Sequence, residues 1–237
     1  MEPVTQLPQQ TLSVAIITKN EEAHLPRTLA SVQFADEIIV LDSASTDRTQ
    51  EIARSFQATV YDEPWKGYAG SKNSAIARCT GTWILSLDAD EELSPELQRQ
   101  IRTLLPTNPP VDAYYIRRRN LFLGRWIKHG GFYPDAKLRL FRRKGANFTT
   151  PPQFEDRPVH ETIVFDGEAS TLDYDIVHHV YPTIETCIEH MDRCSSLGSG
   201  LLVQAGRVSR SLPAFVANVF VIPRLTLLWI LTHVLCM

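Results

Sequence analysis

The stretch Trp83-Ile84-Leu85-Ser86-Leu87-Asp88-Ala89-Asp90 joins an apolar run to two carboxylates that stand one residue apart. A short apolar run bounded by polar residues predicts a buried strand. Ligands of open α/β folds bind beyond the carboxyl ends of the strands, so this strand brings both carboxylates to that edge. In an extended segment Asp88 and Asp90 point to the same side, where both can serve one Mg²⁺ or Mn²⁺ ion that also takes diphosphate oxygens. An exposed acidic turn before the helix that Ser94-Pro95-Glu96 opens is the alternative.

Strand and helix patterns alternate along the sequence before this stretch. Strands are expected at residues 13–17, 37–41, 58–61 and 82–87, and helices after residue 20, at about 47–56 and at about 69–78. Asn20 is expected to cap the first helix, and Asp47 and Gln50 are spaced like a capping box for the second. Such regular alternation predicts βαβ units and a doubly wound parallel sheet.

After Asp90 the alternation is lost. Strands are expected at residues 113–116 and 137–141, the second with charged and apolar side chains alternating, and they make the sheet a mixed one. Between them Gly124 to Pro134 is rich in glycine and aromatic residues, the composition of a loop over a site. A helix is expected from Thr183, with an apolar stripe for core or subunit contact.

The composition limits the classes of protein and partner. The chain has 237 residues, 43% of them hydrophobic, which is enough for one sizeable core. The net charge of −3 gives no support for a nucleic-acid partner. The four cysteines have neither disulfide nor metal spacing and no apolar signal precedes residue 11, so a cytosolic protein is expected. The middle of the chain is basic, which suits either an anionic partner or a solvated face: Arg117, Arg118, Arg119, Arg125, Lys128, Lys137, Arg139, Arg142, Arg143 and Lys144.

The last segment, residues 212–237, is nearly all apolar. Two prolines interrupt it, which favours a helix or hairpin in the membrane interface over a full span, and a buried packing helix is the alternative. We therefore expect a main domain over residues 12–205 and an apolar, helical, membrane-associating C-terminal extension over residues 206–237. The basic residues expected to meet anionic head groups are Arg207, Arg210 and Arg224.

Short polar motifs occur in a particular order along these elements: Thr18-Lys19-Asn20-Glu21, Asp42 to Thr49, Lys72-Asn73 and Asp88-Ala89-Asp90. In this order they resemble the GT-A glycosyltransferases of family 2. Val159-His160-Glu161 and His178-His179-Val180-Tyr181 most resemble the lipopolysaccharide-core branch, the WaaE-like glucosyltransferases. The resemblance covers roughly residues 12–200, and it implies an α/β fold with a Rossmann-like, doubly wound mixed sheet.

The resemblance also implies a set of site residues. Asp42 would contact the uracil or ribose of a nucleotide-sugar, although an Asp at this place can also cap a helix and Asp47 is better suited to that role. Lys72 would meet a phosphate or a donor hydroxyl, whereas a lone helix lysine otherwise faces solvent. The donor residues implied are Thr18, Asn20, Glu21, Asp42, Lys72 and Asp88. The metal ligands implied are Asp88, Asp90 and His178, for Mg²⁺ or Mn²⁺.

The implied reaction is displacement of the diphosphate at the anomeric carbon by an acceptor hydroxyl, with inversion. Glu161 is the implied base, with an ordinary surface glutamate as the alternative, and Asp90 is implied in catalysis through a metal ion that stabilises the leaving diphosphate. His178 is implied as a metal ligand or diphosphate contact, or else is structural. The adjacent His179 faces the other way in a strand.

Together these implications predict a metal-dependent, inverting hexosyltransferase that moves a single glucose from UDP-glucose to a lipopolysaccharide-core or other glycolipid acceptor. It is expected in the cytoplasm, peripheral on the inner face of the cell membrane. Two alternatives stay open: a polyprenyl-phosphate glycosyltransferase, and a non-catalytic nucleotide-sugar-binding protein on the same fold.

Overall fold

The computed structural model describes residues 10–144, 152–156, 161–204, 206 and 211–216. Most of the predicted membrane-associating extension therefore lies outside the described residues, and so do Arg207, Arg210 and Arg224. Among the helices that are described, none is both long and apolar enough to cross a membrane.

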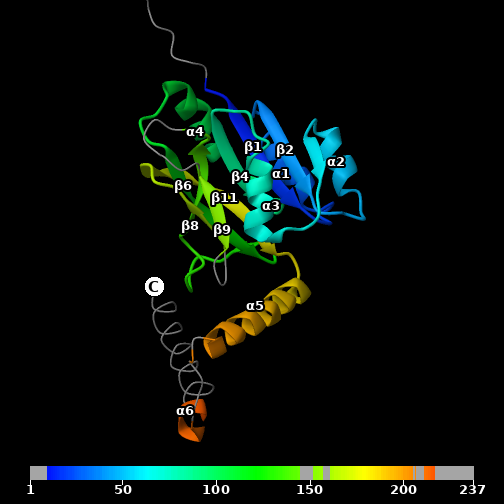
Figure 1. Cartoon of the computed structure of the whole chain (residues 1–237), viewed down its shortest axis with the longest axis vertical. Helices are drawn as coiled ribbons and strands as arrows, with labels where there is room; N and C mark the ends of the chain where they lie inside the picture. Colours follow the sequence, from blue (N-terminus) through cyan, green and yellow to red (C-terminus); the bar gives the residue numbers. More distant parts are fainter. Residues whose placement is uncertain (1–9, 145–151, 157–160, 205, 207–210, 217–237) are drawn as a thin grey trace, which may run out of the picture.

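A large mixed sheet forms the centre of the molecule, with the strand order β3-β2-β1-β4-β8-β6-β11-β5 (Figure 1). Four of its strands run parallel: β1 (Leu12–Thr18), β2 (Glu37–Asp42), β3 (Thr59–Asp62) and β4 (Trp83–Asp88). Three helices alternate with them: α1 (Leu25–Ser31), α2 (Thr49–Ser55) and α3 (Gly67–Ile76). The predicted βαβ alternation is confirmed, so the four strands end at one edge.

The second half of the sheet is mixed, as predicted. β8 (Asp135–Arg142) is antiparallel to β4 and to β6 (Ala113–Phe122), while β11 (Ala169–Tyr181) is parallel to β6. The short β5 (Glu91–Leu93) pairs antiparallel with β11, and β7 (Arg125–Trp126) pairs with the end of β6. Only residues 89 and 90 separate β4 from β5, so the sheet curves until its last strand lies beside the end of β4.

Helices cover both faces of this sheet. Side chains alternate along β4, so Trp83, Leu85 and Leu87 pack on one face and Ile84 packs on the other. The first face also buries side chains of α1 and of α4 (Pro95–Leu104), and the second buries side chains of α3. The predicted start of α4 is confirmed, because the Ser94 hydroxyl accepts a hydrogen bond from the backbone N of Leu97 at 3.3 Å. A 3₁₀ turn, η1 (Leu105–Thr107), follows it.

The predicted cap of the first helix is wrong. α1 begins at Leu25, and Asn20 lies in the left-handed region with φ +55°. The Asn20 Oδ1 accepts a hydrogen bond from the backbone N of Thr46 at 2.8 Å, so it joins the loop after β1 to the loop after β2. The capping box does not form either. Gln50 donates to Asp42 at 2.8 Å, although Asp47 does accept from the backbone N of Thr49 at the start of α2.

A separate hairpin packs beside α3. It consists of β9 (Gln153–Asp156) and β10 (Glu161–Val164), in which Glu161 is paired with Asp156. Asn73 of α3 holds it through the backbone of Phe154: the Asn73 Nδ2 donates to the carbonyl at 2.8 Å, and the Oδ1 accepts from the N–H at 2.7 Å. These two hydrogen bonds place Glu161 against α3.

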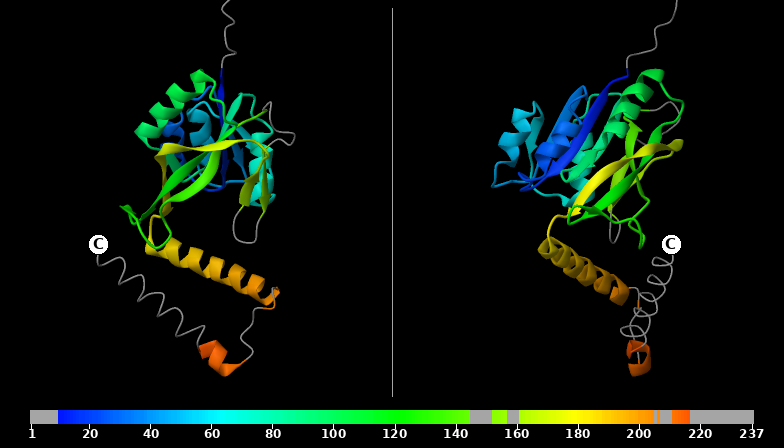
Figure 2. Two further views of the ribbon diagram at one scale, coloured as in Figure 1. Left: turned by 90° about the vertical axis from the view of Figure 1, so that its left-hand side faces the viewer. Right: turned by 180° about the vertical axis from the view of Figure 1, so that it is seen from behind.

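The long helix α5 (Ile184–Gln204) follows β11 and extends away from the sheet, and α6 (Leu212–Val216) comes after it (Figures 1 and 2). α5 confirms the helix predicted from Thr183. The end of the molecule that carries α5 is the end at which β1 finishes, so the helix lies on the side of the sheet edge where ligands of α/β folds bind.

Asn73→Ala should lower the free energy of unfolding by about 2 kcal/mol, because it leaves a buried N–H and carbonyl of Phe154 without partners. Urea denaturation measures this change. Gln100→Ala is the matched control: the Gln100 amide also makes two hydrogen bonds, to Asp173, but in an exposed position, so we expect a loss below about 0.5 kcal/mol. Equal losses in the two variants would contradict the bracing role of Asn73.

Candidate active site

A buried ammonium group joins two of the predicted site carboxylates. Lys72, in the middle of α3, has only 1% of its side chain exposed. Its Nζ lies 2.7 Å from Asp88 Oδ1 at the end of β4 and 2.5 Å from Glu161 Oε1 at the start of β10. Lys72 therefore does not face solvent, and it brings together residues that are far apart in the sequence.

Arg139 of β8 is a second buried cation at this place. One of its guanidinium nitrogens lies 2.8 Å from Asp88 Oδ2 and 2.6 Å from Glu91 Oε1. Glu91 is fully buried, also pairs with Arg118 at 3.2 Å, and accepts a hydrogen bond from the backbone N of Asp88. Both oxygens of Asp88 are thus ion-paired. Sequence reasoning assigned no role to Arg139 or Glu91, because their partners lie on other strands.

These ion pairs determine the charge states of the Asp88 and Glu161 side chains. Burial raises the pKa of Asp88, but the positive charges of Lys72 and Arg139 outweigh it and hold the pKa well below its usual range. Burial likewise raises the pKa of Glu161, and Lys72 again shifts the pKa below its ordinary value. Both groups are therefore carboxylates at neutral pH.

Asp90 faces a different partner from Asp88. Its Oδ2 lies 3.3 Å from His178 Nε2. The Asn120 Nδ2 donates to the carbonyl of Phe132, so the Asn120 Oδ1 is free to accept from His178 Nδ1 at 2.6 Å. This hydrogen bond orients the His178 ring so that its Nε2 faces Asp90. Burial raises the pKa of Asp90, but His178 outweighs it and the pKa is lowered.

His179 points the other way, as predicted for neighbours in a strand. Its Nδ1 lies 2.9 Å from an Arg27 guanidinium nitrogen of α1, and its Nε2 lies 3.0 Å from Glu92 Oε1. Its backbone N donates to the carbonyl of Asp90 at 3.0 Å. His179 therefore fixes the position of Asp90 through the main chain.

The proposed nucleotide residues lie in two loops that are linked together. Asp42 is fully buried and accepts from Ser45, through its N and its hydroxyl, and from Gln50. The backbone N of Glu21 donates to the Thr49 hydroxyl at 2.8 Å. The Glu21 carboxylate bonds His24 at 2.8 Å, and this hydrogen bond raises the pKa of His24. The loops after β1 and β2 thus form one rigid wall.

Two buried hydroxyls in this wall have no hydrogen-bond partner among the described residues: Thr18 Oγ1 and Ser43 Oγ. They are neighbours, because the backbone N of Ser43 donates to the carbonyl of Thr18 at 2.9 Å. Buried polar atoms are nearly always paired, so a pair of free hydroxyls at two strand ends favours a ligand there. Ser43 was not singled out from the sequence, although it lies within the Asp42 to Thr49 motif.

The predicted metal ligands are only partly brought together. Among the described residues no group of three or more His, Cys, Asp or Glu side chains is arranged to hold a metal ion. Asp88 is turned toward its two cations. Asp90 and His178 remain as a pair, and their 3.3 Å separation is close to the ~3.0 Å between adjacent ligands of an octahedral ion. The pair fits two positions of a divalent ion whose other ligands are water or substrate oxygens.

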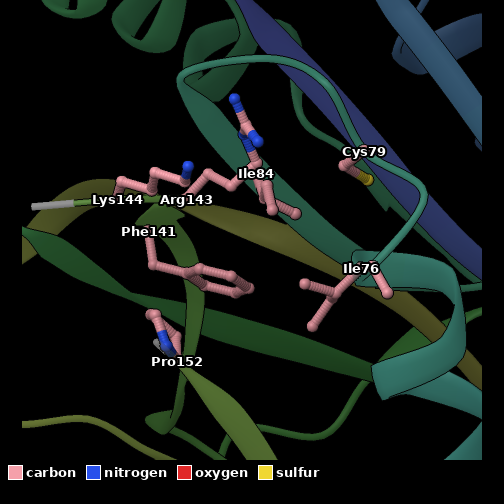
Figure 3. Close-up of a pocket in the computed structure, with 8 residues that line it drawn as sticks. Ile76, Cys79, Ile84, Phe141, Arg143, Lys144 and Pro152 are labelled. Carbon is pink, nitrogen blue, oxygen red and sulfur yellow. The ribbon is translucent and has the colours of Figure 1, made fainter. Parts of the chain in front are cut away.

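A cavity of about 230 Å³ is not part of this site, and Figure 3 shows the side chains that line it. It is lined mainly by apolar residues, among them Ile76, Ile84 and Phe141. Ile84 is the second residue of β4, so the cavity lies at the opposite end of that strand from Asp88. Burial raises the pKa of Cys79 in its wall to about 12, so this thiol is not a nucleophile at neutral pH.

Lys72→Met should destabilise the fold by about 2 kcal/mol or more at neutral pH, because it leaves two half-buried carboxylates without their shared cation. The pKa values of Asp88 and Glu161 are lowered in the folded state, so their contribution to stability is present above the ordinary value of about 4 and is lost as the pH falls below it. Urea denaturation at pH 7 and at lower pH should show the difference from wild type shrinking with acid.

Lys66→Met is the matched control for this change. Lys66 pairs with Glu63, but 49% of its side chain is exposed, so the loss should be below about 1 kcal/mol. A Lys72→Met chain as stable as the Lys66→Met chain would contradict the central role of Lys72.

Known proteins resemble this chain over most of its length. The family model for glycosyl transferase family 2 matches residues 13–161. An uncharacterized glycosyltransferase of Rickettsia typhi is 35% identical over 206 residues, which cover 83% of this chain and 69% of that protein. The lipopolysaccharide core biosynthesis glycosyltransferase LpsC of Rhizobium meliloti is 29% identical over 210 residues, 86% of this chain and 76% of LpsC.

Similarity to solved structures is lower. The crystal structure of S. aureus TarS residues 1–349 in complex with UDP matches with a TM-score of 0.44 and 19% identity, and covers 56% of this chain and 46% of that one. This similarity is too low to assign a ligand. The family match spans the strands and helices up to Glu161, including the Lys72 cluster. The chain belongs to glycosyl transferase family 2 and is a glycosyltransferase.

Proposed function

We propose that this glycosyltransferase transfers a single hexose from a UDP-sugar, with inversion, to a lipopolysaccharide-core or other glycolipid acceptor. The observation that carries the proposal is the arrangement at the sheet edge, where the Lys72, Asp88 and Glu161 cluster adjoins the Asp90 and His178 pair. The similarity to LpsC, a lipopolysaccharide core biosynthesis glycosyltransferase, supports this acceptor class. Glucose as the sugar rests on the sequence motifs.

We assign the nucleotide to the wall formed by the loops after β1 and β2. The free hydroxyls of Thr18 and Ser43 are buried there and supply hydrogen bonds that nothing in the described protein takes up. Asp42 accepts three hydrogen bonds of its own, and a carboxylate accepts about four. Asp42 can therefore accept about one further hydrogen bond, from the ribose or uracil. Its other hydrogen bonds fix the conformation of the loop after β2.

Asp90 and His178 are the residues that would hold Mg²⁺ or Mn²⁺. The hydrogen bond from His178 to Asn120 resembles the outer contacts that orient metal-binding histidines. When bound, the ion supplies Lewis-acid neutralisation of the diphosphate charge. We place Asp88 outside the ligand set, because its oxygens hold Lys72 and Arg139 in position.

Glu161 is the proposed base. It is ionised at neutral pH, and Lys72 binds one carboxylate oxygen, Oε1. The other oxygen takes the proton of the acceptor hydroxyl while the acceptor oxygen bonds to the anomeric carbon and the bond from that carbon to the diphosphate breaks. Lys72 makes Glu161 a weaker base by lowering its pKa, but it also fixes the direction of the carboxylate, and correct placement is the first requirement of a general base.

Glu161→Gln should lower kcat by about 10²-fold or more with nearly unchanged UDP-sugar affinity, because it removes the base and keeps the shape of the site. Steady-state kinetics and donor titration measure the two quantities. Glu155→Gln, on the exposed side of the same hairpin, is the control and should leave both unchanged. Weakened donor binding at normal kcat would make Glu161 a binding residue, and full activity would favour an acceptor that needs no base, such as a polyprenyl phosphate.

Asp90→Asn and His178→Gln should each weaken Mn²⁺-dependent UDP binding at least tenfold, whereas UDP binding in EDTA should not change. Calorimetric titration with and without Mn²⁺ tests this. His129→Gln changes an exposed loop histidine in the same way and should have no effect. If both site variants bind UDP like wild type in Mn²⁺, the metal assignment is wrong.

A further inference from the structure

The end of β6, β7 and the following loop form a projecting segment, residues 121–132, which we call the basic tip. Its Trp126 ring carries two cations: the Arg119 guanidinium lies 4.7 Å from the ring centroid and the Lys128 Nζ lies 4.8 Å from it. Arg125 and Lys128 are exposed, and no carboxylate among the described residues pairs with them. The tip therefore presents positive charge to its surroundings.

The acids near the basic tip do not balance this charge. Arg117 and Arg119 share one buried carboxylate, Asp175, at 3.1 and 3.0 Å. Two buried donors beside it, Arg119 Nε and Trp126 Nε1, have no acceptor in the described part of the chain. Exposed cations without acidic partners, such as Arg125 and Lys128, are the features of a surface that takes anionic oxygens from a partner.

Apolar side chains stand beside these cations. Leu123 is 46% exposed and Phe132 is 38% exposed, both within the basic tip. On α5, Ile184, Ile188 and Met191 are 60–64% exposed and follow the i, i+4, i+7 spacing of one helix face. The acidic residues of this helix are each one position further along, about 100° around the helix, at Glu185, Glu189 and Asp192.

The apolar face of α5 and the basic tip belong to one side of the molecule. Ring contacts connect them: Phe122 at the end of β6 lies 6.1 Å from Tyr181, which lies 5.4 Å from His190 of α5. Figures 1 and 2 show α5 and the chain between β6 and β8 at the end of the molecule where β1 finishes. That is also the end where β4 delivers Asp88 to the candidate site.

We propose that the basic tip and the apolar face of α5 together dock on an anionic lipid bilayer. Arg119, Arg125 and Lys128 meet the head groups, while the exposed apolar side chains enter the acyl boundary. Charge complementarity selects this occupant, since the four cations at and behind the basic tip have only Asp175 as an acidic partner and attract anionic head groups: Arg117, Arg119, Arg125 and Lys128. The acidic residues of α5 lie beside its apolar face and not on it. The docking proposal depends on the proposed function in one respect only: docking would bring the candidate site close to a glycolipid acceptor in the bilayer.

Flotation of the full chain with lipid vesicles tests the basic tip. Wild type should bind vesicles that contain phosphatidylglycerol more tightly than vesicles of phosphatidylcholine alone, and added salt should weaken the difference. Arg125→Glu with Lys128→Glu should lower binding to the anionic vesicles at least ~10-fold, since each basic residue near such a surface is worth about fivefold. Equal binding of wild type to the two kinds of vesicle would overturn the proposal.

Arg99→Glu with Lys144→Glu is the matched control. It makes the same change in net charge on exposed residues away from the basic tip: Arg99 is on α4, and Lys144 follows β8 at the far end of β4. Vesicle binding should stay within about twofold of wild type. If this control weakens binding as much as the tip variant, net charge alone is responsible and the docking surface is wrong.

Ile188→Ser with Met191→Ser tests α5. Vesicle binding should fall several-fold while the chain remains folded by circular dichroism and monomeric by light scattering. A change in oligomeric state with unchanged vesicle binding would assign the face to a second copy and overturn the proposal. UDP affinity, measured in parallel, should not change in any of these variants, so failure of docking and failure of the donor site are distinguished.

Discussion

The candidate site depends on the buried ammonium group of Lys72. Moving a charged side chain out of water costs several kcal/mol, and only close opposite charges offset that cost. Asp88 and Glu161 supply them at 2.7 and 2.5 Å, each from a different part of the chain. Because each carboxylate would be unfavourable without the lysine, α3, β4 and the hairpin hold their relative positions as one unit. Asn73, the residue next to Lys72, strengthens the unit by fixing the hairpin backbone.

The two carboxylates of the Asp-x-Asp stretch, Asp88 and Asp90, contact different partners. An extended segment would point both to one side, which is the geometry that the sequence predicts. β4 ends at Asp88, however, and residues 89 and 90 form a turn, so the alternation stops where the second carboxylate would need it. Asp88 forms ion pairs with Lys72 and Arg139, while Asp90 contacts His178 of β11. The metal site that we propose therefore uses one of the two carboxylates, Asp90, together with a histidine from a distant strand.

Sequence patterns correctly predicted the features that depend on neighbouring residues in the chain. The parallel strands, the start of α4 at Ser94 and the opposite directions of His178 and His179 follow from periodicity and capping, and they are confirmed. The Asn20 cap failed because a partner 26 residues away, Thr46, takes its side chain. Arg139 and Glu91 were assigned no role from the sequence, because their roles depend on which strands become neighbours. Ser43 and Asn73 lie within motifs that the sequence singled out, but the motifs alone gave neither residue a role.

β11 connects the proposed metal site to the proposed lipid-docking surface. It carries His178, which faces Asp90, and its His179 backbone N binds the Asp90 carbonyl, so Asp90 is positioned by β11 as much as by β4. The same strand carries Asp175, which holds the two arginines behind the basic tip, and it leads directly into α5. β11 pairs with both β6 and β5 around His178, although its register with β6 shifts between Thr171 and Asp175 and again between His178 and Tyr181. β11 therefore links one proposed metal ligand, His178, to the elements of the proposed lipid-docking surface, and this link would hold the candidate site near the bilayer.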